Sequence, residues 1–219
     1  MGRATRFDQF LAGVLPMARR NSKRILELPF SILIDTAEQQ PFEFTNIRAD
    51  ADKKYRTYNI TTERVCLGRH PDSLGDYSLT GGIGHCHVER KGQGDAYGTF
   101  LGFSRRGPSS RYDRFKHELE NLSKLDAALV VVECTLQQLL LEAPKTETRS
   151  PQENARMIYR SLLAWQQDYR VQWAFCESRR MAEITTFRWL YRWWEKHLKG
   201  TPSAGLPVNE ADEALLASM

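Results

Sequence analysis

Short apolar runs alternate along the chain with longer segments in which apolar side chains recur every three or four positions. The runs rich in Val, Ile, Leu and Thr predict strands at residues 31–36, 58–68, 75–79, 85–91, 127–135 and 170–178. Helical spacing predicts helices at residues 111–125, 151–168 and 179–199. Since strands alternate with helices and residues 75–91 have the pattern of a hairpin, we expect an α/β fold. The expected architecture is a single domain with a central mixed β-sheet flanked by helices.

The ends of this pattern set the expected domain organisation. Residues 1–29 predict a basic N-terminal arm or short helix, residues 30–199 the folded domain, and residues 200–219 a flexible C-terminal tail. Ser150 and Pro151 are typical of a helix N-cap and first helical residue. Residues 92–110, rich in Gly, Ser and Arg, predict a mobile loop.

Composition narrows the class of protein. Of 219 residues, 41% are hydrophobic and 26% charged, which is ordinary for a globular protein. The formal net charge of +4 is compatible with a polyanionic partner without proving one. Four cysteines stand far apart without a CxxC pair, which predicts free thiols in a reducing compartment and no zinc ribbon. No apolar run reaches the roughly 18 residues that a membrane span needs, so we expect no membrane partner and a cytoplasmic location.

The most informative chemistry lies at the ends of three predicted strands. Side chains alternate faces along a strand, so Glu89 and Lys91 share one face and Arg90 points to the other. The predicted hairpin brings Asp76 close to Glu89 and Lys91, and Asp35 ends the strand at 31–36. Three converging carboxylates repel one another unless a hard cation joins them. Asp35, Asp76 and Glu89 are therefore expected to bind Mg²⁺ (or Mn²⁺), with Lys91 assisting phosphodiester hydrolysis.

Two other interpretations remain open from the residues alone. Most charges at a strand end are solvated surface groups, and a D…ExK pattern by itself is weak. Alternatively, His85 and His87 share the face of Glu89, so that a zinc or manganese site with Asp76 is conceivable. A packed or exposed histidine pair is the simpler reading.

Taken in order, ILIDTAEQQPF, GDYSL and VERKGQGD resemble the nuclease domain of the XPF family of structure-specific DNA endonucleases. The resemblance covers about residues 30 to 198 and implies a restriction-endonuclease-like core. It implies that Asp35, Asp76 and Glu89 are metal ligands and Lys91 the catalytic lysine. It places supporting residues at Glu38, Arg90 and Asp95.

Basic residues downstream are the candidates for DNA contact. SSRYDRFKHELENL followed by AALVVVE is similar to the arginine-bearing helix and following strand of the same family, which makes Arg111 and Arg114 candidates to face the DNA backbone. Arg105 and Arg106 join them from the segment at 92–110. Aromatic residues of the last predicted helix alternate with arginines, and core packing, a dimer face or base stacking would each explain them.

Two departures limit what the resemblance implies. Ala37 stands where the family has arginine, and neither a tandem helix-hairpin-helix module nor a helicase motif is found. We therefore expect a free-standing metal-dependent DNA endonuclease, acting on branched or flap DNA in repair or recombination. A homodimer or a partner subunit is left open. The small size favours a bacterial or viral source, with a nuclear location in a eukaryote. The alternative is a non-cleaving DNA-binding scaffold subunit with the same fold.

Overall fold

The structure is a computed structural model that describes residues 25–49, 56–68, 74–102 and 111–199. Its strands are β1 (Ile25–Glu27), β2 (Ile32–Asp35), β3 (Thr57–Asn59), β4 (Thr62–Val65), β5 (Tyr77–Leu79), β6 (Cys86–Lys91), β7 (Ala127–Val132) and β8 (Gln172–Phe175). Its helices are α2 (Gln93–Leu101), α3 (Arg111–Leu122), α4 (Leu136–Leu141), α5 (Pro151–Tyr169) and α6 (Arg179–His197).

A six-stranded mixed sheet organises the molecule, in the order β4-β2-β5-β6-β7-β8. β5 is antiparallel to both of its neighbours, and the remaining pairs are parallel. The carboxyl ends of β2, β6 and β7 therefore meet the start of β5 at one edge. In α/β sheets this edge is where ligands commonly bind.

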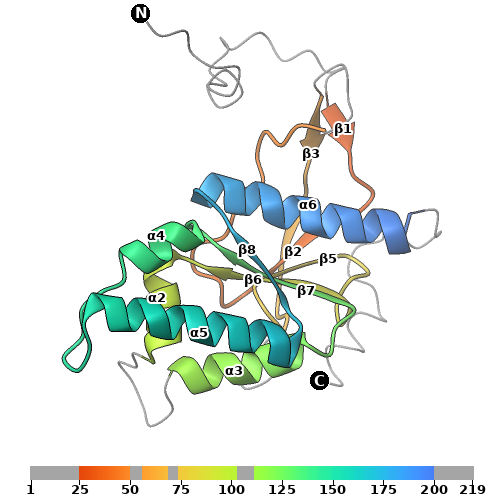
Figure 1. The fold of residues 1–219 in the computed structure, drawn as a ribbon. Coiled ribbons are helices and arrows are strands. Elements are labelled where there is room, and N and C mark those ends of the chain that lie inside the picture. The colour runs from red at the N-terminus through yellow and green to blue at the C-terminus, as the bar shows by residue number, and fades with distance from the viewer. Residues whose placement is uncertain (1–24, 50–55, 69–73, 103–110, 200–219) are drawn as a thin grey trace, which may run out of the picture.

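Helices cover both faces of the sheet, so the architecture expected from the sequence is confirmed (Figure 1). α6 crosses one face, where Phe187 and Leu190 are buried against Val88 and Val131. α2, α3 and α5 pack together on the other face over Val130 and Val132. Both faces of β7 are buried, because its alternate residues enter two different hydrophobic cores. Its sequence is therefore a continuous apolar run.

The strand predictions were right in place, with two corrections near the N-terminus. Residues 58–68 form two strands, since β3 ends at Asn59 and β4 begins at Thr62. β3 pairs in parallel with β1 in a separate two-stranded sheet, so residues 25–27 of the predicted arm are a strand instead. Tyr58 of β3 packs its ring on Phe187 and Tyr191 of α6, which ties this small sheet to the main core.

The predicted loop at 92–110 is wrong for its first half, because α2 occupies Gln93–Leu101. Burial of Ala96 and Phe100 stabilises this helix despite its two glycines. The predicted start of α5 is confirmed: Ser150 caps the helix, Pro151 follows, and Glu153 completes a capping box. A capping box at Thr135 likewise starts α4, which the sequence pattern did not indicate.

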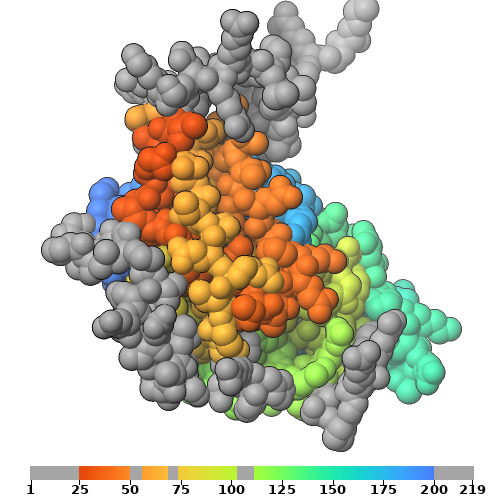
Figure 2. Space-filling view, turned by 180° about the vertical axis from the view of Figure 1, so that it is seen from behind, coloured from red at the N-terminus to blue at the C-terminus, as the bar shows by residue number. Residues whose placement is uncertain are grey.

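From behind, the coloured surface is formed largely by the red and orange residues of β1 to β4 and their connections (Figure 2). The green residues of α2 and α3 lie below them in this view. None of the described helices combines the length and the apolar character that crossing a membrane requires.

Candidate active site

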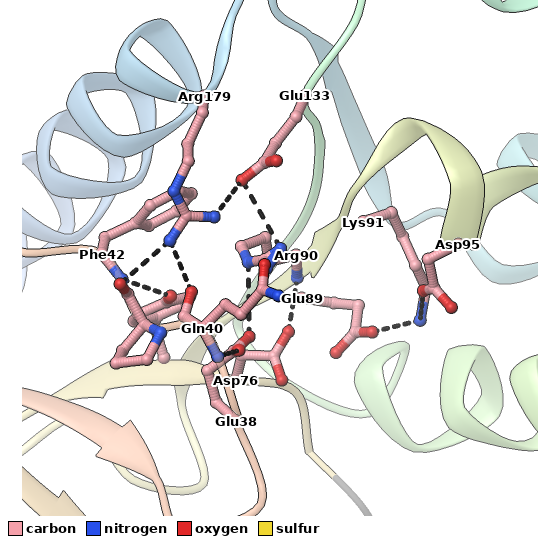
Figure 3. A network of polar contacts seen from close by, with 12 residues as sticks. Glu38, Gln40, Phe42, Asp76, Glu89, Arg90, Lys91, Asp95, Glu133 and Arg179 are labelled. Carbon is pink, nitrogen blue, oxygen red and sulfur yellow. Dashed lines mark hydrogen bonds and ion pairs between the residues drawn. The ribbon is translucent and has the colours of Figure 1, made fainter.

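A polar hollow of about 500 Å³ opens at the edge where the strand ends converge. Its charged lining residues come from the segment after β2, from the start of β5, from β6, from α2 and from the end of β7 (Figure 3). They are Glu38, Asp76, Glu89, Arg90, Asp95 and Glu133. Five carboxylates thus face a single guanidinium group.

Gly75 brings Asp76 into this hollow. Its φ of +94° is a conformation that side chains strain, and a Cβ there would lie 3.1 Å from the carbonyl oxygen of Val88. The backbone of β6 therefore passes directly beside the start of β5. Asp76 is then fixed by its own carboxylate, whose Oδ2 accepts a hydrogen bond from the Arg90 amide at 2.7 Å.

Glu89 and Lys91 form an ion pair on one face of β6, as their spacing predicts. The Lys91 side chain is only 11% exposed, and its Nζ lies 4.5 Å from the ring centre of Phe115. Burial disfavours the ammonium, but the charges of Glu89, Glu118 and Asp95 outweigh it and raise the pKa of Lys91. Lys91 is therefore charged at neutral pH.

Glu118 of α3 belongs to the site, although sequence reasoning did not find it. Its Oε2 lies 3.9 Å from Lys91 Nζ, and its carboxyl group hydrogen-bonds that of Glu89. Burial and the charge of Glu89 raise the pKa of Glu118 well above its ordinary value. The available signal was its place three residues after Phe115, which puts it beside the buried face of the helix.

Burial, and next the charge of Glu89, raise the pKa of Asp76 well above its ordinary value. Burial alone would also raise the pKa of Glu89. The Lys91 ammonium and hydrogen bonds from Glu118, Lys91 and Asp76 nevertheless hold it below its ordinary value. Neighbouring carboxyl groups whose proton affinities are driven apart in this way are typical of functional sites.

A second chain of polar contacts runs on the opposite face of β6 from Lys91 (Figure 3). Arg90 contacts Glu38 at 3.3 Å and Glu133 at 3.5 Å. Glu133 also pairs with Arg179 at 2.7 Å, at the first residue of α6. Glu133 could have been noticed, because it directly follows the buried strand β7.

Arg179 holds the segment that follows β2. Its Nη2 donates to the carbonyl oxygens of Gln40 at 2.5 Å and Pro41 at 3.0 Å. The next residue, Phe42, stacks on Tyr77 and donates its amide to the Tyr77 hydroxyl at 3.0 Å. This segment, which carries Glu38, is thereby fastened to both β5 and α6.

Asp35 ends β2 as predicted, but its carboxylate is engaged elsewhere. Oδ1 accepts from the Leu67 amide at 2.8 Å and Oδ2 from the Ala37 amide at 3.0 Å. Asp35 therefore closes the turn after β2 and anchors the end of β4, and it does not line the hollow. Arg64 of β4 donates to the carbonyl oxygens of Thr36 and Glu38, on either side of Ala37.

The two histidines of β6 and the residue before it, His87 and His85, do not line the hollow. His85 pairs with Asp126 at 2.7 Å on the surface. His87 is fully buried, accepts a hydrogen bond from the Gly84 amide, and has its pKa lowered to about 3 by burial. Since neither contacts Asp76, the structure does not support the histidine-based metal site.

Two of the four arginines predicted to contact DNA, Arg111 and Arg114, lie in the described part of the chain, on α3. Arg111 begins α3 and pairs with Asp95 at 2.9 Å, at the rim of the site. Arg114 is exposed on the same helix. Arg105 and Arg106 lie outside the described residues.

The aromatic face of α6 is largely internal. Phe187, Trp193 and Trp194 are buried in the core, and Tyr191 packs against Phe30 and Tyr58. Core packing therefore explains this pattern, and the buried rings are not placed to stack on the bases of a single strand.

Within the described residues, no group of three or more His, Cys, Asp and Glu side chains is arranged as a ready-made metal site. Of the three carboxylates expected to converge, Asp76 and Glu89 lie together in the hollow, and Asp35 does not. This donor set still fits Mg²⁺, which usually binds through one or two carboxylates and keeps several waters. Burial and the charge of Glu89 raise the pKa of Asp76, and a cation held between the two carboxylates would lower it.

Comparisons with known proteins give a likeness in structure alone. No protein-family model and no curated protein matches the chain. Among solved structures, it is similar to XPF from Aeropyrum pernix in complex with DNA, at 14% identity and a TM-score of 0.49, over 78% of this chain and 68% of that one. It is also similar to XPF from Aeropyrum pernix alone, at 13% identity and a TM-score of 0.49, over 74% and 60% of the two chains.

Proposed function

We propose that this protein is a divalent-cation-dependent DNA endonuclease that hydrolyses phosphodiester bonds. The observation that supports it most is the contact between the buried carboxyl groups of Asp76 and Glu89 in the lining of the hollow. Lys91 pairs with Glu89, yet burial and the charge of Glu89 still raise the pKa of Asp76. A bound cation would offset the repulsion between these two carboxylates.

Asp76 and Glu89 would hold the cation, in keeping with the oxygen ligands that Mg²⁺ prefers. When bound, the ion polarises a phosphoryl oxygen and lowers the pKa of an attacking water. Asp35 would join these ligands only by giving up one of its two backbone hydrogen bonds. It therefore acts first as a positioning residue for the segment after β2.

Lys91 serves as a donor in this proposal, because its raised pKa keeps its proton in place. An ammonium can orient the attacking water and stabilise the charge that develops on the phosphate. Water adds to phosphorus and one P–O ester bond breaks, which leaves a phosphate monoester and a hydroxyl. Phe115 and Glu118 pack beside the Lys91 ammonium, which pairs with Glu89 of the hollow.

The choice of DNA, and of branched or flap DNA in particular, rests on the resemblance of ILIDTAEQQPF, GDYSL and VERKGQGD to the XPF nuclease domain. A non-cleaving scaffold with the same fold is the second candidate. Among the described residues, the retention of Asp76, Glu89 and Lys91 in one contacting group favours the enzyme.

The test is a cleavage assay on labelled flap, fork, duplex and single-stranded DNA, with single-stranded RNA alongside, in Mg²⁺, Mn²⁺ or EDTA. We expect metal-dependent cutting, strongest on a branched DNA. Asp76→Asn should reduce it by at least about a hundredfold, since a metal ion supplies several kcal/mol of transition-state stabilisation. Asp126→Asn is the matched control, because Asp126 is an exposed acid paired with His85 away from the hollow.

Binding without cutting, on every substrate and with either metal, would support the scaffold and end the enzyme proposal. Cutting that survives Asp76→Asn at the wild-type rate would show that another site does the chemistry. Preference for RNA would keep the site but replace the substrate.

A further inference from the structure

A second hollow, of about 530 Å³, lies at the beginning of α5. Three arginines and two hydroxyl residues line it, with Glu153 and Met157 between them. We refer to Arg149, Arg156 and Arg160 as the α5 basic surface. None of these side chains is required for packing, because all three are exposed.

The three arginines share one side of the helix. Arg156 and Arg160 are four residues apart and so are neighbours on one face, and Arg149 stands just before the N-cap Ser150. From Arg149 to Arg160 the chain advances by about 16 Å at the helical rise. The α5 basic surface is therefore an extended row of guanidinium groups with the hydroxyls of Thr148 and Ser161 beside it.

One carboxylate, that of Glu153, lines the hollow with these arginines and interacts electrostatically with Arg149 and Arg156. Among the described residues, no carboxylate lies within ion-pair distance of any of the three guanidinium groups. The carboxylate of Glu153 is hydrogen-bonded to Ser150 in the capping box. In contrast, Arg179 and Arg180 at the start of α6 are both ion-paired. Three exposed arginines beside one carboxylate leave an excess of positive charge, which favours an anionic ligand.

The α5 basic surface belongs to the same side of the molecule as the candidate active site. Gln93, two residues after Lys91, bonds Glu142 at 2.8 Å, and Asn154 of α5 bonds the Pro144 carbonyl at 2.8 Å. α2, α4 and the beginning of α5 accordingly lie together beside the sheet (Figure 1). A polyanion that leaves the hollow over Gly92 would pass the segment at 142–150 and reach α5.

We propose that the α5 basic surface binds the phosphate backbone of a duplex arm next to the bond that is cut. This inference rests on the proposed function, and it names the part of the DNA that the α5 basic surface binds. Guanidinium groups match phosphate oxygens in geometry and in charge. A duplex carries one negative charge per about 1.7 Å of axis, so that a row of about 16 Å meets phosphates along its whole length.

A duplex is favoured over a single strand by the residues beside the arginines. Proteins that hold single strands combine basic grooves with several aromatic platforms on which bases stack. The hollow at α5 has no aromatic lining residue, and Tyr159 is the one exposed aromatic side chain of α5 next to it. Contacts of this kind would position the DNA without reading its sequence.

The test compares two variants with the same change in net charge. Arg156→Gln/Arg160→Gln removes two positive charges from the α5 basic surface. Gln166→Glu/Gln167→Glu adds two negative charges at exposed positions further along α5. Both are made in an Asp76→Asn background, and the Kd for a labelled duplex and for a single strand is measured in EDTA by fluorescence anisotropy between about 50 and 200 mM salt.

We expect the arginine variant to lose at least about tenfold in duplex affinity at low salt, and its slope of log K against log salt to fall in magnitude by about 1.8. The glutamate variant should keep the wild-type slope. Thermal unfolding should be alike for both, because the changed residues are exposed.

An unchanged slope in the arginine variant would overturn this inference, whether or not the wild type cuts DNA. An equal loss in the glutamate variant would reduce the effect to net charge and also overturn it. A greater loss on the single strand than on the duplex would overturn the assignment to a duplex arm. A wild type that never cuts, but whose slope depends on these arginines, would end the proposed nuclease function and leave the DNA-binding surface standing.

Discussion

Lys91 shows at the scale of one residue how the site depends on balanced charges. Its ammonium contacts Glu89, lies near Asp95 and Glu118, and is almost wholly enclosed. Removing it leaves several carboxyl groups together in a space with little water. In buried ion pairs the loss of one partner is costly because the other charge stays behind.

We predict that Lys91→Met abolishes cutting and lowers the free energy of unfolding by about 3 kcal/mol at neutral pH in EDTA. Methionine keeps the length of the side chain and removes the charge. Urea unfolding gives the stability, and Lys116→Met on α3 is the control. A loss below about 1 kcal/mol would show that the carboxyl groups accommodate protons so readily that Lys91 is not their counter-ion.

Gly75 positions the site through the backbone, because it places Asp76 beside β6. Gly75→Ala places a Cβ against the β6 backbone at a positive φ, so we expect a loss of about 1 to 3 kcal/mol and weaker cutting through displacement of Asp76. Gly94→Ala is the matched control. Its Cβ would meet nothing within 4 Å and it lies in α2, so stability should rise by up to about 1 kcal/mol. Equal effects of the two changes on urea unfolding would contradict the role given to Gly75.

The sequence predicts site residues well where geometry follows from strand alternation. Asp76, Glu89 and Lys91 meet because a hairpin and a two-residue period leave few other arrangements. Asp35 shows the limit of this reasoning, because position at a strand end does not decide which amides a carboxylate will accept. Glu118 was missed since its contact with Glu89 depends on how α3 packs against the sheet.

At the scale of elements, long apolar runs and capped helices were predictable, and α2 was not. Its sequence, QGDAYGTFL, has two glycines and little apolar periodicity, which describes a loop by composition. Tertiary contacts decide otherwise, because Ala96 and Phe100 are buried against α3 and α5. A Cβ at Gly98 would stand 2.7 Å from a guanidinium nitrogen of Arg111, so an alanine there would displace the end of that side chain.

The start of α5 gives an element-scale prediction. Ser150 accepts a hydrogen bond from the Glu153 amide, and Glu153 in turn accepts from Ser150. We expect Ser150→Ala to lower the free energy of unfolding by about 1 kcal/mol, as measured by urea unfolding. Gln152→Ala, at an exposed position in the same turn, should stay within about 0.5 kcal/mol of the wild type. If the two variants are equally stable, the capping box contributes nothing measurable.

At the scale of the whole molecule, the net charge of +4 conceals a separation of charge. The candidate active site gathers buried carboxyl groups, and the α5 basic surface has three exposed arginines beside one carboxylate. Under the proposed function, a polyanion would be attracted to the α5 basic surface, and a cation bound by Asp76 and Glu89 would offset their charge beside it. Overall charge alone could not have predicted this arrangement, because it depends on which helix ends and strand ends the fold brings to one side.

This arrangement couples the stability of the whole molecule to pH. Asp76 and Glu118 have pKa values raised well above 3.8 and 4.5, so the folded form holds more protons than the unfolded chain above these values. The free energy of unfolding in EDTA should therefore fall as the pH rises from these ordinary values to the raised pKa values of the folded protein. Glu89, whose pKa is lowered, acts in the opposite sense, but only below about its ordinary value of 4.5.

A divalent cation should reverse this trend, because it takes the place of the protons at Asp76. We expect the rise in Tm caused by Mg²⁺ to be small at about pH 5 and larger at about pH 8, where the carboxyl groups ionise more readily. At about 100 times the Kd, Mg²⁺ adds about 2.7 kcal/mol, or about 5 to 10 °C for a chain of this size. Asp76→Asn should flatten both dependences, and Asp126→Asn should leave them unchanged. A Mg²⁺ effect that is equal at both pH values, or that persists in Asp76→Asn, would place the cation somewhere other than between Asp76 and Glu89.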